Sequence, residues 1–416
     1  MSTVFSHSVT LDKAKCKGCI NCMKRCPTEA IRVRNGKAHI IEDRCIDCGE
    51  CIRVCHNHAK KAVYDSFNTI YNYKYKVALP APSLYGQFNN LTDIDYVLTG
   101  LKMIGFDDVW EVSRSAEIIS DLTRKILSKE NIKKPCISSA CPAVEKLIAV
   151  RFPNLCENLL PVLAPVEIAA KKAREEAVEI TGFDPKEIGI FFISPCPAKV
   201  TSAKYPIGHN EMLIDGVLSA SDVYMRLVPA MGDIDVPQQL SSSGLVGISW
   251  ASSGGESSAL LRDKYLAADG IENVIKVLEE LEDDKLNGLE FIELNACAGG
   301  CVGGVLNVEN PFVARAKIHT LRKYLPVSLN RFDQRDNSID DFMWTTKLEY
   351  TPVFRLDVDR SVALRKLKEV RSIHENLPGL DCGLCGAPTC RAFAEDVVNE
   401  EMSIDQCVRM QLQGGK

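Results

Sequence analysis

The chain has 416 residues, too many for one ordinary domain, and 46% of them are hydrophobic and 25% charged, as in globular proteins. The net charge of −5 argues against nucleic acid as a partner, and no stretch reaches the roughly 18 uncharged apolar residues of a membrane-spanning helix. The first 13 residues contain no apolar core of signal-peptide length, so we expect a cytoplasmic protein. In such a reducing compartment, 18 cysteines indicate metal ligation and not disulfides.

The first 65 residues contain two cysteine runs of identical spacing, which are Cys16, Cys19, Cys22, Cys26 and Cys45, Cys48, Cys51, Cys55. This C-x2-C-x2-C-x3-C spacing resembles that of bacterial ferredoxins. Three cysteines at this spacing wrap three corners of one iron–sulfur cube, and the fourth lies too far along to close the same cube. We therefore expect one 4Fe–4S cluster on Cys16, Cys19, Cys22 and Cys55, and another on Cys45, Cys48, Cys51 and Cys26. Two zinc sites are the alternative, although zinc sites usually pair cysteines two by two.

From about residue 73 to residue 345, strand-like and helix-like segments alternate. We predict buried strands at 75–79 and 189–193, and amphipathic helices at 94–104, 115–127 and 162–177. A capping-box pattern at 219–222 predicts a helix over 223–227. This alternation indicates an α/β region in which helices pack on both faces of mostly parallel sheets.

Three short cysteine motifs in this region each follow a strand-like segment, at 134–137, 189–193 and 289–293. They are Ser138–Ser139–Ala140–Cys141–Pro142, Ser194–Pro195–Cys196–Pro197–Ala198–Lys199, and the segment 291–304 with Cys297 and Cys301. Ligands of open α/β sheets bind where strands end, so we expect these four thiolates to converge. Cys141 and Cys196 each precede a proline suited to the first helical position, where the positive end of a helix favours an anionic cluster. The glycine pairs around Cys301 are expected to let the backbone approach a bulky inorganic group.

These motifs, in this order behind two ferredoxin-like runs, resemble the signature motifs of FeFe hydrogenases over nearly all of residues 10–345. The resemblance implies an α/β core of two lobes of mostly parallel sheet, with a ferredoxin-like α+β domain before it and a small helical Fe–S domain after it. It also implies an H-cluster, in which a 4Fe–4S cube is joined to a two-iron unit carrying CO, cyanide and a bridging azadithiolate, and it implies maturation proteins that assemble this cofactor. Carried over by position, the ligands of the cube are Cys141, Cys196, Cys297 and Cys301, with Cys301 shared with the two-iron unit. Lys199 is expected to donate to a cyanide, and the turn that resembles the family's cyanide-binding turn is Ala81–Pro82–Ser83.

Several positions depart from the catalytic branch of the family. Ala140 stands where a cysteine passes protons to the bridging amine, and Ser194 and Asn295 stand where methionines are usual. Leu122 aligns loosely with a glutamate of the usual proton path. Because general acid–base steps contribute roughly 10²–10⁴-fold, we expect a slow hydrogenase, and the pattern resembles the sensory branches of the family. Glu256 and Glu293 are candidates for a substitute proton path, the alternative being ordinary solvated or ion-paired glutamates.

The last segment combines a predicted helix at 360–374, a turn at 377–379 and four cysteines, which are Cys382, Cys385, Cys390 and Cys407. Their C-x2-C-x4-C-x16-C spacing resembles that of small Fe–S domains of redox proteins and predicts a third accessory 4Fe–4S cluster, with zinc as the alternative. Cys136 and Cys156 are left over, and we interpret them as small buried hydrophobes. The predicted domains are 1–70 (two-cluster ferredoxin-like), 71–350 (H-cluster domain) and 351–416 (C-terminal 4Fe–4S domain).

Three functions fit this pattern. The first is a low-turnover hydrogenase that interconverts H2 with two protons and two electrons and acts as a hydrogen or redox sensor. The second is a metabolic or electron-bifurcating hydrogenase subunit, and the third is a non-catalytic Fe–S assembly protein without the two-iron unit. The retention of Lys199 and of all four cube cysteines favours the first two. The expected partners are H2, protons and a redox or signalling protein, with no nucleic acid and no membrane.

Overall fold

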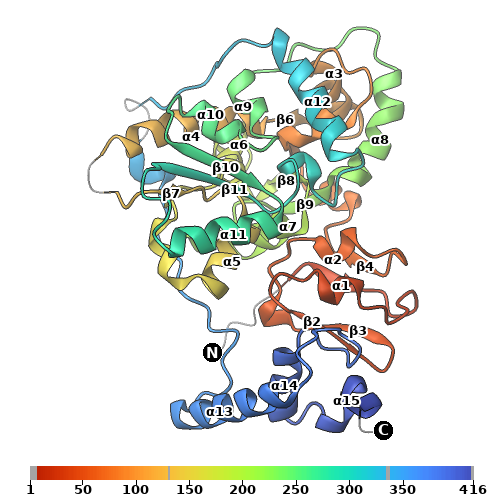
Figure 1. Ribbon diagram of the computed structural model, residues 1–416. Helices are drawn as coiled ribbons and strands as arrows, with labels where there is room; N and C mark the ends of the chain where they lie inside the picture. Colours follow the sequence, from red (N-terminus) through yellow and green to blue (C-terminus); the bar gives the residue numbers. More distant parts are fainter. Residues whose placement is uncertain (1–6, 130–131, 334–337, 414–416) are drawn as a thin grey trace. The chain divides into compact units, whose positions relative to one another are not determined.

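The computed structural model describes residues 7–129, 132–333 and 338–413, and these residues form two compact units (Figure 1). The core unit comprises the described part of Val63–Glu349, and the terminal unit combines the described parts of Met1–Ala62 and Tyr350–Lys416. The described residues before Val63 and those after Glu349 therefore belong to one compact unit. The division of the sequence at residues 70 and 350 into three domains remains a proposal, and residues 1–6 of its first domain lie outside the described residues. None of the described helices is both long enough and apolar enough to cross a membrane.

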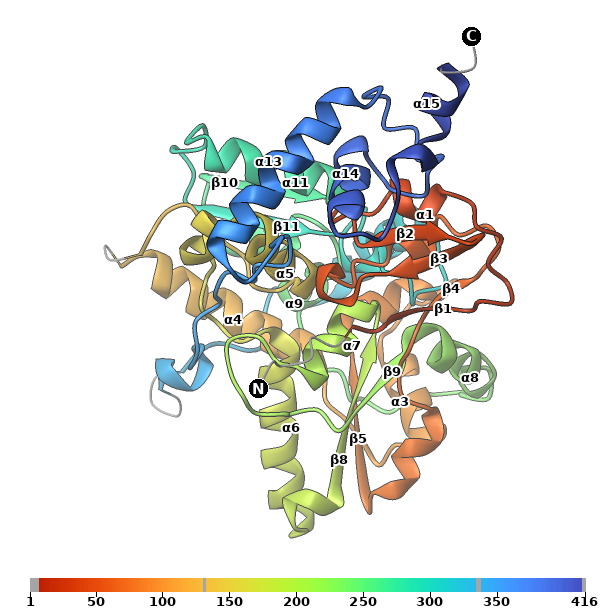
Figure 2. The ribbon, with the colours of Figure 1, turned by 90° about the horizontal axis from the view of Figure 1, so that it is seen from below.

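The first sheet of the core unit has four parallel strands in the order β6–β5–β8–β9. Their bounds are β5 (Tyr75–Pro80), β6 (Asp108–Val109), β8 (Ile188–Ser194) and β9 (Gly216–Ser219). The apolar run of β8 is buried along its whole length, as expected for a central strand covered on both faces. Figure 2 shows the covering helices, with α6 (Pro165–Thr181) on one side of the sheet and α3 (Asp95–Met103) and α8 (Ala220–Gly232) on the other.

The second sheet has three parallel strands in the order β10–β11–β7, with bounds Tyr265–Asp269, Phe291–Asn295 and Cys136–Ile137. In Figure 1, α11 (Ile271–Glu282) runs along one face of this sheet and α10 (Gly255–Ala259) lies on the other. Two parallel sheets with helices on both faces confirm the predicted fold class of the core. The remaining α-helices in the described part of the unit are α4 (Val112–Leu127), α5 (Pro142–Arg151), α7 (Pro197–Lys204), α9 (Leu245–Ser249) and α12 (Pro311–Leu321).

The predicted elements agree with the structure where apolar periodicity was strong, and they deviate at the ends. The strands predicted at 75–79 and 189–193 are β5 and β8, and the helices predicted at 94–104 and 115–127 are α3 and α4. The helix predicted from residue 162 begins only at Pro165, because a proline is favoured in the first helical position. The prediction of a capping box was wrong, because the Ser219 side chain makes no capping hydrogen bond. Its hydroxyl instead lies 2.6 Å from that of Ser221.

The terminal unit contains two antiparallel strand pairs and several short helices. The strands are β1 (Val9–Leu11) paired with β4 (Lys60–Ala62), and β2 (Ile31–Arg34) paired with β3 (Lys37–Ile40). The helices are α1 (Asn21–Lys24), α2 (Glu50–Arg53), α13 (Arg360–Asn376), α14 (Cys390–Val398) and α15 (Val408–Gln413). Helix α13 confirms the helix predicted at 360–374, and its first turn is capped by the Asp359 carboxylate, which accepts from the Ser361 and Val362 N–H groups.

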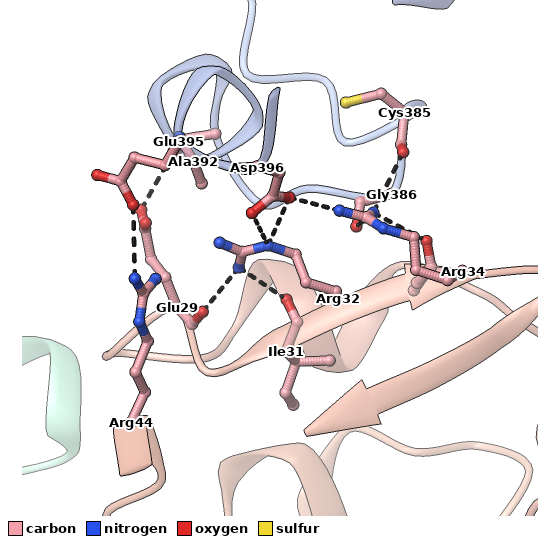
Figure 3. A network of polar contacts seen from close by, with 12 residues as sticks. Glu29, Ile31, Arg32, Arg34, Arg44, Cys385, Gly386, Ala392, Glu395 and Asp396 are labelled. Atoms are coloured by element: carbon pink, nitrogen blue, oxygen red, sulfur yellow. Dashed lines mark hydrogen bonds and ion pairs between the residues drawn. The ribbon is translucent and has the colours of Figure 1, made fainter. Parts of the chain in front are cut away.

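A buried ionic network joins β2 to α14 within the terminal unit (Figure 3). The Nε of Arg32 donates to both carboxylate oxygens of Asp396, at 3.0 and 2.8 Å, and Arg34 binds the same carboxylate through Nη2. Arg34 also donates to the carbonyl of Gly386, 2.7 Å away. Arg32 and Asp396 are only 2% and 4% exposed. Because removing one partner leaves a buried charge uncompensated, each such pair typically costs about 3–5 kcal/mol to break.

Backbone contacts hold the C-terminal cysteine loop against the same part of the terminal unit. The Val33 N–H donates to the carbonyl of Gly386 at 2.9 Å, which extends the edge of β2. The ammonium of Lys24 donates to the carbonyls of Asp381 and Pro388, at 2.7 and 2.8 Å. The loop that carries Cys382 and Cys385 is therefore fixed by residues of the first cysteine run and its following strand.

Candidate functional site

The cysteines of the terminal unit lie in three groups. Cys22 is electrostatically coupled to Cys16, Cys19 and Cys55, whereas a cavity of about 350 Å³ is lined by Cys26, Cys45, Cys48 and Cys51. The structure therefore brings together the two sets that the sequence predicts, with the fourth cysteine of each run beside the other run. A further cavity of about 360 Å³ is lined by the four C-terminal cysteines, Cys382, Cys385, Cys390 and Cys407.

The surroundings of these thiols fit iron–sulfur clusters. Burial raises the pKa of Cys22 to about 11 and that of Cys51 to about 12, so as free groups they would stay protonated. A bound metal cation reverses this preference and deprotonates a coordinating thiol. Backbone N–H groups also point at the sulfurs, from Ala30 to Cys26 and from Ala59 to Cys55, each at 3.2 Å. Hydrogen bonds of this kind stabilise the negative charge of a cluster.

The cysteine motifs of the core unit follow the ends of its parallel strands. Strand β7 leads to Cys141, the residue before α5, and strand β8 leads to Cys196, the residue before α7. Both cysteines have extended backbone and both helices begin with proline, as the sequence predicts. Strand β11 leads to Cys297 and Cys301, and the carbonyl of Cys297 accepts from the Gly300 N–H at 3.1 Å.

Lys199 is a buried lysine within the electrostatic influence of this group of thiols. Burial opposes its charge, but the combined negative charge of Cys301, Cys196 and Cys141 outweighs this effect and raises the pKa of Lys199. Conversely, burial raises the pKa of Cys196 to about 12, with the Lys199 ammonium opposing it. Three of the four predicted ligands of the cube, from two different sheets, are therefore within electrostatic reach of one buried lysine.

Glycines around Cys301 allow three loops to pack closely. A Cβ at Gly300 would lie 2.4 Å from the backbone nitrogen of Ser253, and a Cβ at Gly304 would lie 2.2 Å from the carbonyl oxygen of Pro195. Gly300 also has a φ of +91°, a conformation that favours glycine. We predicted that these glycines make room for an inorganic group. That prediction stays open, and at Gly300 and Gly304 the structure shows a further requirement for glycine, the contact of the Cys301 loop with neighbouring backbone.

A cavity of about 570 Å³ adjoins Cys301 and Lys199. Its apolar wall includes Phe192, Val112 and Val166, and its polar wall is formed by Ser83, Lys199, Glu256, Glu293 and Asn295. Apolar cavities with a few convergent polar groups typically bind small ligands or cofactors. The cavity also includes all three residues of the predicted cyanide-binding turn, Ala81, Pro82 and Ser83.

The residues of this cavity fit an H-cluster. The hydroxyl of Ser83 is buried and has no hydrogen-bond partner within the described part of the chain, so it is available to a ligand in the cavity. Lys199 supplies a buried cation beside the cube cysteines, and its ammonium donates to the carbonyl of Ala140 at 2.7 Å. A negatively charged cofactor with small polar ligands would therefore meet both a cation and a free hydroxyl.

Of the four positions that depart from the family, two line the cavity and two do not. Ala140 and Asn295 both line it, and Ala140 contributes no exchangeable side-chain proton. Ser194 is absent from the cavity lining; its hydroxyl donates to the carbonyl of Cys196 at 3.0 Å and so shapes the turn into α7. Leu122 is fully buried in the apolar core of α4 and does not line the cavity either.

Glu256 and Glu293 both line the cavity and are buried, at 5% and 3% exposure. The hydroxyl of Ser138 donates to Glu256 at 2.6 Å. Burial, followed by the charge of Glu293, raises the pKa of Glu256 to about 8. Burial also raises the pKa of Glu293, although this carboxylate accepts from the N–H groups of Gly254 and Ser257 and from Asn295. These two carboxyl groups are therefore not the solvated or ion-paired glutamates of the alternative interpretation.

Sequence reasoning missed three residues of this region. Ser138 belongs to the first motif but received no role, because its bond to Glu256 spans 118 residues of sequence. Trp250 lines the cavity and donates its indole N–H to Ser120 at 3.0 Å. Glu145 is a buried acid coupled to Lys199, and burial raises its pKa well above the usual range. Its position four residues after Cys141, in the largely apolar sequence of α5, was the available signal.

The two remaining cysteines differ from each other. Cys136 is 2% exposed within the apolar core of the second sheet, as expected for a small hydrophobe, and its thiol donates to the carbonyl of Lys133 at 3.2 Å. Cys156 is only half-buried, so its interpretation as a buried hydrophobe was wrong.

The family model described as the iron-only hydrogenase large subunit, C-terminal domain, matches residues 74–262 and 258–305, more than half of the chain. The chain belongs to the iron-only hydrogenase family. A model for a 4Fe–4S dicluster domain matches residues 8–56 of this hydrogenase, and a model for an Fe–S cluster domain matches residues 377–409. Iron–sulfur binding by a hydrogenase-type protein is thereby established, in agreement with the cysteine groups of the structure.

Curated relatives cover most of the chain at low identity. The periplasmic iron hydrogenase large subunit of Nitratidesulfovibrio vulgaris is 25% identical over 360 residues, 72% of this chain and 86% of the relative. Iron hydrogenase 1 of Clostridium pasteurianum is 24% identical over 370 residues, and the match covers 72% of this chain but only 64% of the relative. A solved FeFe-hydrogenase structure from Chlamydomonas reinhardtii is similar at a TM-score of 0.46 and 17% identity, over 61% of this chain and 86% of that chain, which is too weak to bear on the site.

Proposed function

We propose that this hydrogenase interconverts H2 with two protons and two electrons at low turnover, and that it serves as a hydrogen or redox sensor. The observation that carries the proposal is the composition of one cavity wall. Cys301 and Lys199 are retained there, whereas Ala140 replaces the thiol that the family uses to move protons. A site of this kind can hold the cofactor and react with H2 but lacks the usual acid–base step, which is typically worth roughly 10²–10⁴-fold.

The proposed ligands of the cube are Cys141, Cys196, Cys297 and Cys301. When bound, the two-iron unit supplies the metal centre at which H2 is split or formed. Lys199 would neutralise the negative charge of the bound cofactor and donate to one of its small ligands, and the Ser83 hydroxyl, which has no partner among the described residues, would donate to another. Glu145 is a further buried acid within electrostatic reach of Lys199, and burial raises its pKa well above the usual range.

We propose that Glu256 takes over the proton-handling role of the missing thiol. Its carboxyl group lines the cavity, it has a pKa of about 8, and Ser138 connects it to the backbone N–H of Ala140, which donates to the Ser138 hydroxyl at 3.2 Å. A carboxyl group with a pKa close to the working pH can both donate and accept a proton. Glu293, whose carboxylate accepts three hydrogen bonds, is the second carboxyl group of this buried pair that can carry a proton.

Electrons are proposed to move through three accessory 4Fe–4S clusters in the terminal unit, held by the three cysteine groups described above. Accessory clusters allow exchange with a redox or signalling partner protein. We place the protein in the cytoplasm, because so many thiol ligands require a reducing compartment during assembly. Cell fractionation tests this placement, and the relative from Nitratidesulfovibrio vulgaris, which is described as periplasmic, is the appropriate comparison.

Infrared spectroscopy under H2, after maturation with the two-iron cofactor, tests the proposal. We expect bands of metal-bound CO and cyanide that change when H2 is exchanged for argon, together with H2 oxidation far slower than that of a catalytic relative. The absence of these bands would favour a non-catalytic Fe–S assembly protein. Fast turnover that appears only with a redox partner would favour a metabolic or electron-bifurcating subunit.

A further inference from the structure

The two cysteine runs of the terminal unit are structural repeats of each other. Gly18 and Asp47, each two residues into its run, both have positive φ, as do Glu29 and His58, each three residues beyond the last cysteine. The equivalent alanines, Ala30 and Ala59, donate their N–H groups to the fourth cysteine of their run at the same distance, 3.2 Å.

The residue after each of these alanines breaks the symmetry. In the first repeat it is Ile31, and in the second it is Lys60. Both positions begin strands and both side chains are buried, at 2% and 3% exposure. Lysine is among the residues least often buried without a partner, because an unpaired charge is costly in an apolar environment. A buried lysine at the position that the first repeat fills with isoleucine therefore requires a compensating negative charge.

No protein group in the described part of the chain supplies that compensation. The Nζ of Lys60 is buried and has no hydrogen-bond partner among these residues. Lys60 pairs with Leu11 of β1, and the neighbouring core contains Val9, Met23 and Ile31 together with thiols of both groups. Among the influences on the pKa of Cys22 and of Cys51, Lys60 is second only to burial, and it exceeds the opposing influence of Asp47 on Cys51.

Cys22 and Cys51 belong to different cysteine groups, so one ammonium is within electrostatic reach of both cluster sites. A cluster gains one negative charge when it takes up an electron, and a nearby buried cation stabilises the reduced form more than the oxidised form. We propose that Lys60 is a buried cation shared by the two ferredoxin-like clusters, and that it raises the reduction potentials of both. The proposal rests on the accessory clusters of the proposed function, and it adds one residue that influences the reduction potentials of two of them.

The test is an EPR-monitored redox titration of the full-length protein carrying Lys60→Met. Methionine fills the same volume without charge, and we expect the reduction equilibrium of each cluster to become at least tenfold less favourable, a shift of about 59 mV for one electron. Lys61→Met is the matched control, because Lys61 is the next residue of β4, is half-exposed and pairs with Asp12 at 3.1 Å. Exposed charges are screened, so this variant should keep the wild-type potentials.

Iron and sulfide analysis separates the possible outcomes. If Lys60→Met retains both clusters and either potential stays at the wild-type value, the shared-cation proposal is overturned. An equal shift in Lys61→Met would also overturn it, because net charge alone would then explain the result. If Lys60→Met does not assemble, Lys60→Ile restores the residue of the first repeat and is held to the same expectation. A wild-type protein without reducible clusters at residues 16–55 would instead contradict the accessory-cluster assignment itself.

Discussion

The hydroxyl of Ser138 donates a 2.6 Å hydrogen bond to the carboxylate of Glu256, and it accepts one of 3.2 Å from the N–H of Ala140. The position that lost its thiol is therefore connected, through a single serine, to a buried acid on the wall of the same cavity. The pKa of that acid is raised to about 8 by burial and by the charge of Glu293. The chain has retained a group that can exchange a proton near neutral pH, at a different place in the sequence.

Replacing Glu256 by glutamine is expected to lower both H2 oxidation and H2 evolution by about 10²-fold, the lower end of typical acid–base contributions. Glutamine keeps the size of the side chain and a bond to Ser138 but cannot exchange a proton. Rates measured with an artificial electron carrier check this outcome. Glu280→Gln, an exposed position paired with Lys285 at 3.3 Å, is the control and should not change the rate. Unchanged rates in Glu256→Gln would remove this residue from the proton path.

The dependence of the rates on pH should reveal the same group. Below a pH of about 8 Glu256 is protonated and can donate to H2 evolution, and above it the carboxylate can accept a proton during H2 oxidation. We therefore expect evolution to fall and oxidation to rise as the pH passes through about 8. The inflection should disappear in Glu256→Gln, and a wild-type profile without it would contradict the assignment.

The same pKa shift has a defined consequence for stability. The folded-state pKa of Glu256 lies above its ordinary value of 4.5, so between these two values the folded protein binds more protons than the unfolded chain. Its contribution to stability is then fully favourable below 4.5 and is lost progressively as the pH rises to about 8. The melting temperature of Glu256→Gln should accordingly fall less steeply with rising pH over this range than the melting temperature of the wild type.

Ala140→Cys should increase turnover. Because Ala140 lines the cavity and its carbonyl already accepts from Lys199, a thiol at this position would face the cofactor site without a change of backbone. We expect H2 evolution to rise by about 10-fold to 10²-fold, part of the usual acid–base contribution. Ala149→Cys introduces a thiol into the buried face of α5 away from the cavity lining and should leave the rate unchanged. Equal rates in the two variants would show that another step limits turnover.

Asp396→Asn should detach the C-terminal segment from the rest of the terminal unit. It leaves the buried guanidinium of Arg32 without its counter-ion, and the loss is expected to be about 3–5 kcal/mol. Faster limited proteolysis between α13 and α14 would report this change. Glu395→Gln is the control, since Glu395 lies 3.6 Å from Arg44 in a weaker pair. Wild-type protease resistance in Asp396→Asn would show that packing, and not the ionic network, holds the segment.

Local signals in the sequence predicted the cluster sites, whereas contacts between distant segments had to come from the structure. Cys16, Cys19 and Cys22 could be grouped because the spacing of ligands in one loop is set by the chain itself. Cys141, Cys196 and Cys301 could be placed at strand ends because parallel strands end at a common edge. Nothing local indicates that Ser138 binds Glu256 or that Arg32 binds Asp396, since each pair depends on how separate elements pack.

The errors of the sequence analysis have similar causes. Serine commonly caps helices, but the hydroxyl of Ser219 bonds to that of Ser221 instead of capping the helix. Both interactions are local, so the sequence pattern does not distinguish between them. Ser194 was singled out because it stands where a methionine is usual, and the structure shows that its hydroxyl donates to the carbonyl of Cys196. Lys60 was not noticed at all, because a lysine next to another lysine is unremarkable until its burial is known.

The pairing of Arg32 with Asp396 imposes an order on biosynthesis. The two residues are 364 positions apart, so at about 5–20 residues per second a ribosome needs about 20–70 s to deliver the carboxylate after the guanidinium has emerged. During that interval the nascent ferredoxin-like segment carries a cation that its finished fold keeps out of water. The ferredoxin-like segment thus reaches its final state only after Asp396 has been translated, which sets the earliest point at which its buried ionic network can close.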